Sequence, residues 1–287
     1  KKAVDDYGKV NFETCCISLE VPGVGQGYSR KDGYAPNRYD PERFISFNQT
    51  LSAYELEDLS SGEIFPFVLF GLGFRTNFMI SNPNFAKIRG SLEFFSSAGK
   101  GDYIPLEGFL PVSSFPWILE PFGMFGLPTL YDGNSLQTGW ARIVSENGEK
   151  VNAAAVIQQF GAGVIPPPIF NEFGVIPAEP SDDFSVFYDG KNGANTGIAI
   201  ANPSNQEVEI DCRLYDSSGS LIGASQIIIG PRHSTAKLIP EIFSNLPKSR
   251  LADIQGTAYF SSLIPVYAIA TRIDLGPTFT TMPVMAK

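Results

Sequence analysis

The side chains that could carry out chemistry in this chain are few and scattered. The chain has one histidine, His233, which follows Pro231 and Arg232 in a stretch typical of a turn. A catalytic base needs a nucleophile and a group that orients it. Ser234 is adjacent in sequence, which is poor geometry for a triad, and the strand–turn–helix motif G-x-S-x-G is absent. We therefore expect His233 to be a turn residue, and we expect a protein that is not an enzyme and has no catalytic residues.

Aspartates are the second group that could act, either as an acid–base pair or as cation ligands. The candidates are Asp182, Asp183, Asp189, Asp211 and Asp216. They occupy turn and strand-end positions, where aspartate is common for conformational reasons. A carboxylate pair for glycoside hydrolysis is defined by its separation in space, which the sequence does not give. The D-x-D-x-D-G calcium loop is absent. We expect no cofactor, with calcium at Asp182–Asp183 or Asp189 as the one alternative.

Three cysteines are present, at Cys15, Cys16 and Cys212. A disulfide between the two neighbours would be strained, so one alternative pairs Cys212 with Cys15 or Cys16 and leaves a thiol for an intermolecular bond. The other alternative is that all three are small buried hydrophobic residues. Neither C-x-x-C nor H-x-x-x-H spacing occurs, so we expect no zinc site and no other bound metal.

Aromatic residues crowd into the stretch between Gly108 and Gly133. They are Phe109, Phe115, Trp117, Phe122, Phe125 and Tyr131, and the last five are the candidate interaction patch. One interpretation is an exposed patch that binds a partner subunit or the face of a sugar, with Trp117 and Tyr131 as the stacking side chains. The other is that these rings cover the open end of a hydrophobic core.

The elements that must position these residues occur twice. Thr196–Ser204 reads TGIAIANPS, and Thr76–Asn84 reads TNFMISNPN, 120 positions earlier. The same offset relates Leu92 to Cys212 and Phe94 to Leu214, which indicates an internal duplication. In each copy, alternating apolar residues predict a strand, and Asn-Pro predicts the turn that ends it.

Each copy contains about seven short alternating segments separated by turn residues, which is typical of an antiparallel β-sandwich of the immunoglobulin-like kind. The sequence predicts an all-β chain with two tandem domains, at 64–180 and 181–287. Leucine and isoleucine spacing predicts one short helix within Lys237–Leu246. In the first copy, the stretch Gly108–Gly133 reads as an irregular insertion in place of that helix.

Residues 1–63 precede the first copy and form an N-terminal arm. Val10, Phe12, Thr14 and Cys16 alternate with polar residues and predict one strand. A capping box predicts a short helix over about Ala53–Leu59. We interpret the four alternating residues as an assembly arm, because such a strand can complete the sheet edge of a neighbour.

The bulk composition limits the partners. The net charge is −9 and the pI about 4.7, which argues against nucleic acid or an anionic membrane surface as a partner. No apolar run approaches the roughly 20 residues of a membrane-spanning helix. The first ten residues lack the apolar core of a signal peptide. We prefer a mature secreted form, extracellular or at the cell surface, over a cytosolic protein.

Several short segments recur in one order: TGIAIANP, YDSSGSLIG, QGTAYFSS, YAIATR and FTTMPV in the second copy, with LQTGWARIVS and GVIPA in the first. This order resembles a tandem β-sandwich repeat module of secreted and surface proteins of environmental bacteria. The resemblance covers about Phe65–Met285. It implies β-sandwich modules without assigned catalysis, and it carries over no functional residues.

These observations together predict an extracellular structural protein. We expect a self-assembling fibre or surface-layer subunit, a homo-oligomer or filament joined by strand addition from the N-terminal arm. The alternative is a monomeric adhesin module that binds a polysaccharide or a cell surface.

Overall fold

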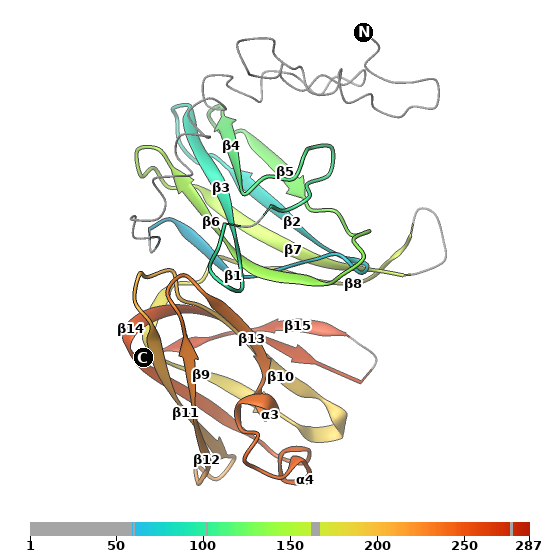
Figure 1. The fold of residues 1–287 in the computed structure, drawn as a ribbon, viewed down its shortest axis with the longest axis vertical. Coiled ribbons are helices and arrows are strands. Elements are labelled where there is room, and N and C mark those ends of the chain that lie inside the picture. The colour runs from blue at the N-terminus through green and yellow to red at the C-terminus, as the bar shows by residue number, and fades with distance from the viewer. Residues whose placement is uncertain (1–58, 60, 102, 162–166, 276–277) are drawn as a thin grey trace.

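The computed structural model describes residues 59, 61–101, 103–161, 167–275 and 278–287 (Figure 1). This part of the chain is all-β, its strands pair antiparallel, and its helices are single turns. None of the helices in these residues has the length and apolar character of a membrane span. The strand predicted at Val10–Cys16 and nearly all of the helix predicted at Ala53–Leu59 lie outside the described residues.

Residues 63–178, called the first half below, form two four-stranded sheets, ordered β1-β6-β3-β4 and β5-β2-β7-β8. The strands are β1 (Glu63–Phe70), β2 (Phe74–Ser81), β3 (Ile88–Ser96), β4 (Ser114–Leu119), β5 (Met124–Pro128), β6 (Gln137–Ser145), β7 (Asn152–Phe160) and β8 (Ile169–Val175). Phe78 and Ile80 of β2 point into the same core cluster as Leu92 and Phe94 of β3. The alternation along each strand therefore places one apolar row between the sheets.

Residues 180–286, the second half, form one connected sheet system. Its elements are β9 (Pro180–Asp189), η2 (Lys191–Gly193), β10 (Asn195–Ala201), β11 (Val208–Asp216), β12 (Leu221–Ile229), β13 (Ser234–Leu238), α3 (Ile239–Ile242), α4 (Lys248–Leu251), β14 (Gln255–Ile273), β15 (Phe279–Met282) and β16 (Met285–Ala286). A second core cluster lies between its strands, built from residues such as Phe184, Ile200 and Phe260.

Strand pairing follows the same order in both halves. The first part of β14 lies between β9 and β11, as β6 lies between β1 and β3. After a register shift between Ser261 and Val266, β14 continues between β10 and β15, as β7 lies between β2 and β8. One 19-residue strand thus does in the second half what two strands do in the first.

The duplicated threonine ties two strands together in each half. The buried Thr76 hydroxyl accepts a hydrogen bond from the Leu69 N–H at 3.0 Å and donates to the Leu69 carbonyl at 2.9 Å. Thr196 does the same on β9, accepting from the Asp189 N–H at 3.1 Å and donating to the Phe187 carbonyl at 3.2 Å. The hydroxyl thus satisfies backbone groups on a strand that does not pair with its own.

The duplicated asparagine fixes the turn that follows. The buried Asn202 amide nitrogen donates to the carbonyls of Gln206, Ile229 and Gly230 at 2.7, 3.2 and 2.9 Å. Its Oδ1 accepts from the Ser204 N–H at 3.1 Å. Asn82 repeats the arrangement with the carbonyls of Ala86, Leu119 and Glu120, at 2.8, 3.3 and 3.0 Å. The repeated motif is therefore a structural tie between two sheet ends.

One expectation from the sequence is wrong, and another is confirmed. Gly108–Gly133 is no irregular insertion, because it contains β4 and β5, which hold the places of β12 and β13. Pro116 lies in the edge strand β4, where its missing N–H removes no ladder bond. A short helix lies within Lys237–Leu246 as predicted; it is α3, and the first two residues of that range belong to β13.

Candidate functional site at the seam between the halves

The five aromatic residues predicted as a possible patch do not lie together. Trp117 is 2% exposed and Phe115 is also buried, both in the first core. Trp117 lies opposite Gly90 on β3, and a Cβ at Gly90 would meet its ring at 2.1 Å. The interpretation of these two residues as part of an exposed patch is therefore wrong. The indole of Trp117 fills the space that the missing side chain at Gly90 leaves. Tyr131 is half-buried and stacks on Phe160 at 4.5 Å.

Phe122 alone of the five is largely exposed, at 63%, while Phe125 is half-buried beside the core. The Phe122 ring makes an edge-to-face contact with Phe85, 5.0 Å between centroids. Phe122 also has a φ of 58°, in the left-handed region that residues other than glycine seldom adopt. This second pair of rings was not among the sequence expectations, because Phe85 comes from another turn.

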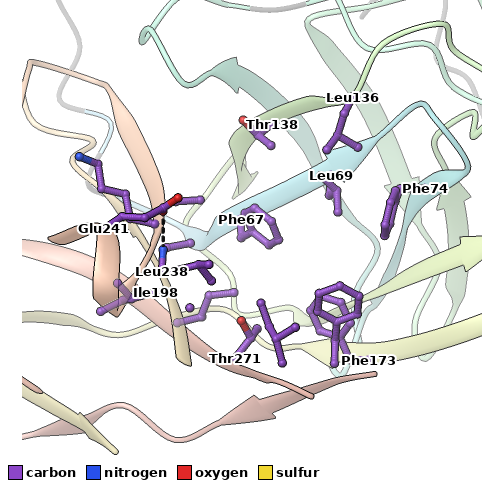
Figure 2. A pocket seen from close by; sticks show the side chains of 17 residues that line it. Phe67, Leu69, Phe74, Leu136, Thr138, Phe173, Ile198, Leu238, Glu241 and Thr271 are labelled. Carbon is purple, nitrogen blue, oxygen red and sulfur yellow. Dashed lines mark hydrogen bonds between the residues drawn. The ribbon is translucent and has the colours of Figure 1, made fainter. Parts of the chain in front are cut away.

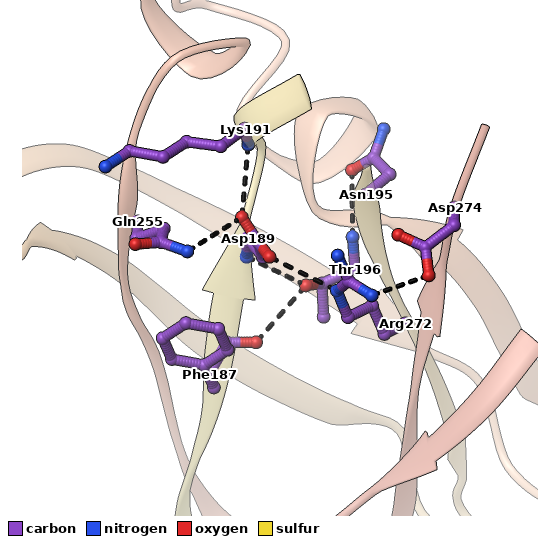
Figure 3. Close-up of polar contacts among 8 residues, drawn as sticks. All are labelled: Phe187, Asp189, Lys191, Asn195, Thr196, Gln255, Arg272 and Asp274. Atoms are coloured by element: carbon purple, nitrogen blue, oxygen red, sulfur yellow. Dashed lines mark hydrogen bonds and ion pairs between the residues drawn. The ribbon is translucent and has the colours of Figure 1, made fainter. Parts of the chain in front are cut away.

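Asp189 is the one of the five candidate aspartates that forms an ion pair and several hydrogen bonds. Asp189, at the end of β9, accepts hydrogen bonds from the Lys191 N–H at 3.1 Å, from Gln255 at 3.2 Å and from Arg272 at 3.2 Å (Figure 3). Arg272 also contacts Asp274 at 2.5 Å. Burial alone would raise the pKa of Asp189, but these hydrogen bonds and the Arg272 charge hold it below its ordinary value. Asp189 thus joins the η2 turn to β14.

The other four aspartates do not converge on Asp189. Asp182 and Asp183 lie near the opposite end of β9, about 20 Å away at the usual rise per residue. Asp216 accepts from the Ser218 N–H and hydroxyl in the β11–β12 turn, and Asp211 is exposed on β11. Within the described ranges, no three His, Cys, Asp or Glu side chains group as metal ligands.

Cys212 is a buried thiol on β11. Burial, with the nearby Asp211 charge, raises its pKa to about 12. The thiolate, the reactive form, is therefore scarce at neutral pH. Cys15 and Cys16 lie outside the described residues, so a disulfide with Cys212 stays a prediction.

The two halves meet along a seam that is closed at one end by Trp140 of β6. The indole N–H donates to the Arg232 carbonyl of the second half at 2.8 Å, and the ring stacks on Phe95 at 4.2 Å. Beside it, the Ser234 N–H donates to the Ser97 carbonyl at 3.1 Å. A small core cluster here combines Leu59, Ile64, Phe95 and Trp140 with Ala201 and Tyr267. The turn that contains His233 is therefore a docking element.

The middle of the seam is a sheet face packed on a strand. Gly197, Ala199 and Ala201 form the row of β10 that points away from the second core. Ala199, together with Ile269 of β14, belongs to the core cluster of the first half. Small side chains on β10 therefore let β1 approach the sheet closely.

The other end of the seam borders a partly open cavity of about 290 Å³ (Figure 2). Phe67, Leu69, Phe74 and Phe173 line it from the first half, facing Ile198 and Leu238 of the second. Its one carboxylate, Glu241, already accepts a hydrogen bond from the Leu238 N–H at 2.8 Å. Beyond the cavity, the Thr281 hydroxyl donates to the Gly174 carbonyl and joins β15 to β8. The lining is mostly apolar and can hold apolar groups.

A further feature is the free edge of β12, the outermost strand of its sheet. Among the edge strands of the described residues, β12 is the longest, and it carries neither a charged residue nor proline. Leu221 and Ile228 are exposed on it, and side-chain hydrogen bonds reach two of its carbonyls, from Asn245 to Ala224 and from Asn202 to Ile229. Such an edge is a template for pairing with another strand. Its place at the edge follows from the strand order, which no local sequence pattern shows.

No protein-family model matches the chain, and neither a curated protein nor a solved structure shows significant similarity to it.

Proposed function

We propose that the chain is an extracellular structural protein that self-assembles head-to-tail into a fibre or surface layer. In this proposal, residues 64–180 and 181–287 are two tandem immunoglobulin-like β-sandwich domains of the secreted bacterial module named above. The role is mechanical, without catalysis or a cofactor. The partner is another copy of the chain, reached through the N-terminal arm.

The observation that carries the proposal is the free edge of β12. Strand addition needs an acceptor edge without charge or proline and a donor strand that alternates in register with the pleat. β12 offers nine uncharged residues. The donor that we assign is Val10–Cys16, with Val10, Phe12, Thr14 and Cys16 on one face, in the part of the chain that the structure does not describe.

The seam supports a load-bearing role. A fibre subunit must keep its modules in one orientation, and the two halves are held at both ends, by Trp140 on Arg232 and by Thr281 on Gly174. The contacts between them are apolar, whereas interfaces between independently moving domains are more polar.

The adhesin alternative is disfavoured, because Trp117, its main candidate for stacking on a sugar, is buried. Tyr131 remains, but it is already stacked on Phe160. We therefore keep assembly as the function that the geometry supports best.

Deletion of residues 1–49 tests the donor, and Ile228→Lys tests the acceptor. Ile228 is exposed and lies opposite Glu209 on β11, so lysine there adds an edge charge without a like-charged neighbour. Leu263→Lys is the matched control, since Leu263 is 99% exposed on β14, away from the β12 edge. Sedimentation and electron microscopy should show assembly for the full chain and for Leu263→Lys only. Undiminished assembly of the truncated chain would refute the arm mechanism.

A further inference from the structure

The seam has two faces, and each has a counterpart elsewhere in the chain. On the second half, the docking face is the outward row of β10 with the turn Arg232–Ser234. On the first half, the receiving face is β1 at its bulge, with Trp140 opposite that bulge on β6. Because strand order is the same in both halves, a second docking face and a second receiving face exist at the two ends of the molecule.

The counterpart of the docking face lies on the sheet β5-β2-β7-β8. Asn77, Met79 and Ser81 of β2 hold the positions of Gly197, Ala199 and Ala201 and point away from the core. Met79 lies beside Gly126 on β5 and Ala154 on β7. All of these side chains are uncharged, and they are exposed or half-buried.

The counterpart of the docking turn is the β4–β5 turn, at the end of the first half farthest from the second half (Figure 1). Phe122 has the left-handed φ of 58° that Arg232 has at 63°. The following residues match too, because the Asn82 N–H donates to the Gly123 carbonyl as the Asn202 N–H donates to the His233 carbonyl. The turn therefore has the backbone conformation of one that is docked at the seam.

The docking turn at the seam and its counterpart, the β4–β5 turn, differ in solvent exposure. Pro203 is buried at the seam, whereas its counterpart Pro83 is exposed. Phe85 is 89% exposed and touches Phe122, in the place where Asn205 bonds to Arg232 at the seam. Two exposed rings in contact form an apolar surface of the kind that other proteins use for contact.

The counterpart of the receiving face lies on the second half. Phe187 of β9 holds the position of the β1 bulge, is 48% exposed, and lies opposite Thr257 as the bulge lies opposite Trp140. The large and small side chains are exchanged between the docking and receiving faces. At the seam a large Trp140 receives small β10 residues, whereas here a small Thr257 faces the solvent and the docking side carries Met79 and Phe122.

We propose that the first half of one copy docks through Met79 and the Phe85–Phe122 pair onto the Phe187–Thr257 face of a second copy. The contact repeats between molecules the geometry of the seam within the chain. It is head-to-tail and does not close, so it propagates as a filament. A second copy is the occupant because one chain holds both faces, with complementary sizes and no charge on the docking row. The inference rests on the proposed function and adds a second contact to it, so that a filament needs both the arm and this docking surface.

Two variants and a control test the docking turn. Phe122→Gly removes the ring at a φ that glycine adopts without strain, so the fold should be kept. Leu72→Gly is the matched control, since Leu72 is also an exposed apolar residue, with a φ of 47°, in the β1–β2 turn at the other end of β2. Sedimentation velocity of the full chain should show at least tenfold weaker association for Phe122→Gly and no change for Leu72→Gly. Equal association of both variants with the unaltered chain would overturn the proposal.

A mixing experiment tests the pairing of the two faces. Met79→Lys disables the docking face, and Phe187→Lys disables the receiving face. Each variant alone should be monomeric, whereas their equimolar mixture should form dimers only, through the one intact pair of faces. A mixture that stays monomeric, or single variants that still form filaments, would refute the contact. If deletion of residues 1–49 abolishes assembly while Met79→Lys does not, the arm mechanism holds and this contact fails. If Met79→Lys abolishes assembly while the deletion does not, this contact holds and the arm mechanism fails.

Discussion

Replacing Asn202 with alanine should destabilise the protein far more than a surface substitution. Its amide group donates to three carbonyls and its oxygen accepts from Ser204, all near a buried strand end. Each net hydrogen bond contributes about 1 kcal/mol, and buried carbonyls left without a partner add about 1–3 kcal/mol. We expect a loss of about 3–4 kcal/mol, a large share of the roughly 5–15 kcal/mol of a typical domain.

The assay is urea unfolding followed by tryptophan fluorescence, with Asn82→Ala as the paired variant and Asn152→Ala as the control. Asn82 makes the same set of bonds, so its loss should be of similar size, whereas Asn152 is exposed on β7 and should change stability by less than about 0.5 kcal/mol. Losses below about 1 kcal/mol for either buried asparagine would refute the structural role of the repeated motif.

Three further predictions follow from buried polar groups. Arg142→Ala should lower the free energy of unfolding in urea by about 3–5 kcal/mol, because the buried Glu93 carboxylate, 2.7 Å from the guanidinium, loses its ion-pair partner. A loss under about 1 kcal/mol would contradict this. In a chain whose other two cysteines are serine, Cys212 should react with a thiol reagent at pH 8 only after unfolding, and prompt labelling of the folded chain would contradict its raised pKa. The pKa of Asp189 is lowered in the folded state, so its contribution to stability is present above its unfolded pKa of about 3.9 and is lost as pH falls through the folded pKa. Asp189→Asn should lower stability at pH 7 and flatten its fall below about pH 4, as measured by urea unfolding across pH, and an unchanged slope would count against the Arg272 interaction.

The strands of the repeated motif could be predicted because their signals are local. Alternation in Thr76–Ser81 and Thr196–Ala201, followed by Asn-Pro, reports the buried row and the exit turn directly. The β4–β5 region was misread because Pro116 and Gly126 resemble loop residues when the strand's place at a sheet edge is unknown. Edge position depends on strand order, which no single segment carries.

The seam could not be predicted from the sequence for the same reason. Trp140 and Arg232 are 92 residues apart, and each reads as an ordinary core or turn residue by itself. The aromatic stretch shows the limit most clearly, because Trp117 and Phe122 lie five residues apart and end in opposite environments. Trp117 fills the space above Gly90, a contact between strands that the spacing of aromatic residues does not reveal.

Electron microscopy of the purified full-length chain, beside the chain lacking residues 1–49, tests the central claim most directly. The account predicts head-to-tail filaments or a surface layer for the full chain. For the truncated chain it predicts a loss of assembly, with circular dichroism that remains that of a folded β protein. Monodisperse monomers of the full chain at high concentration, or filaments unchanged by the deletion, would contradict it.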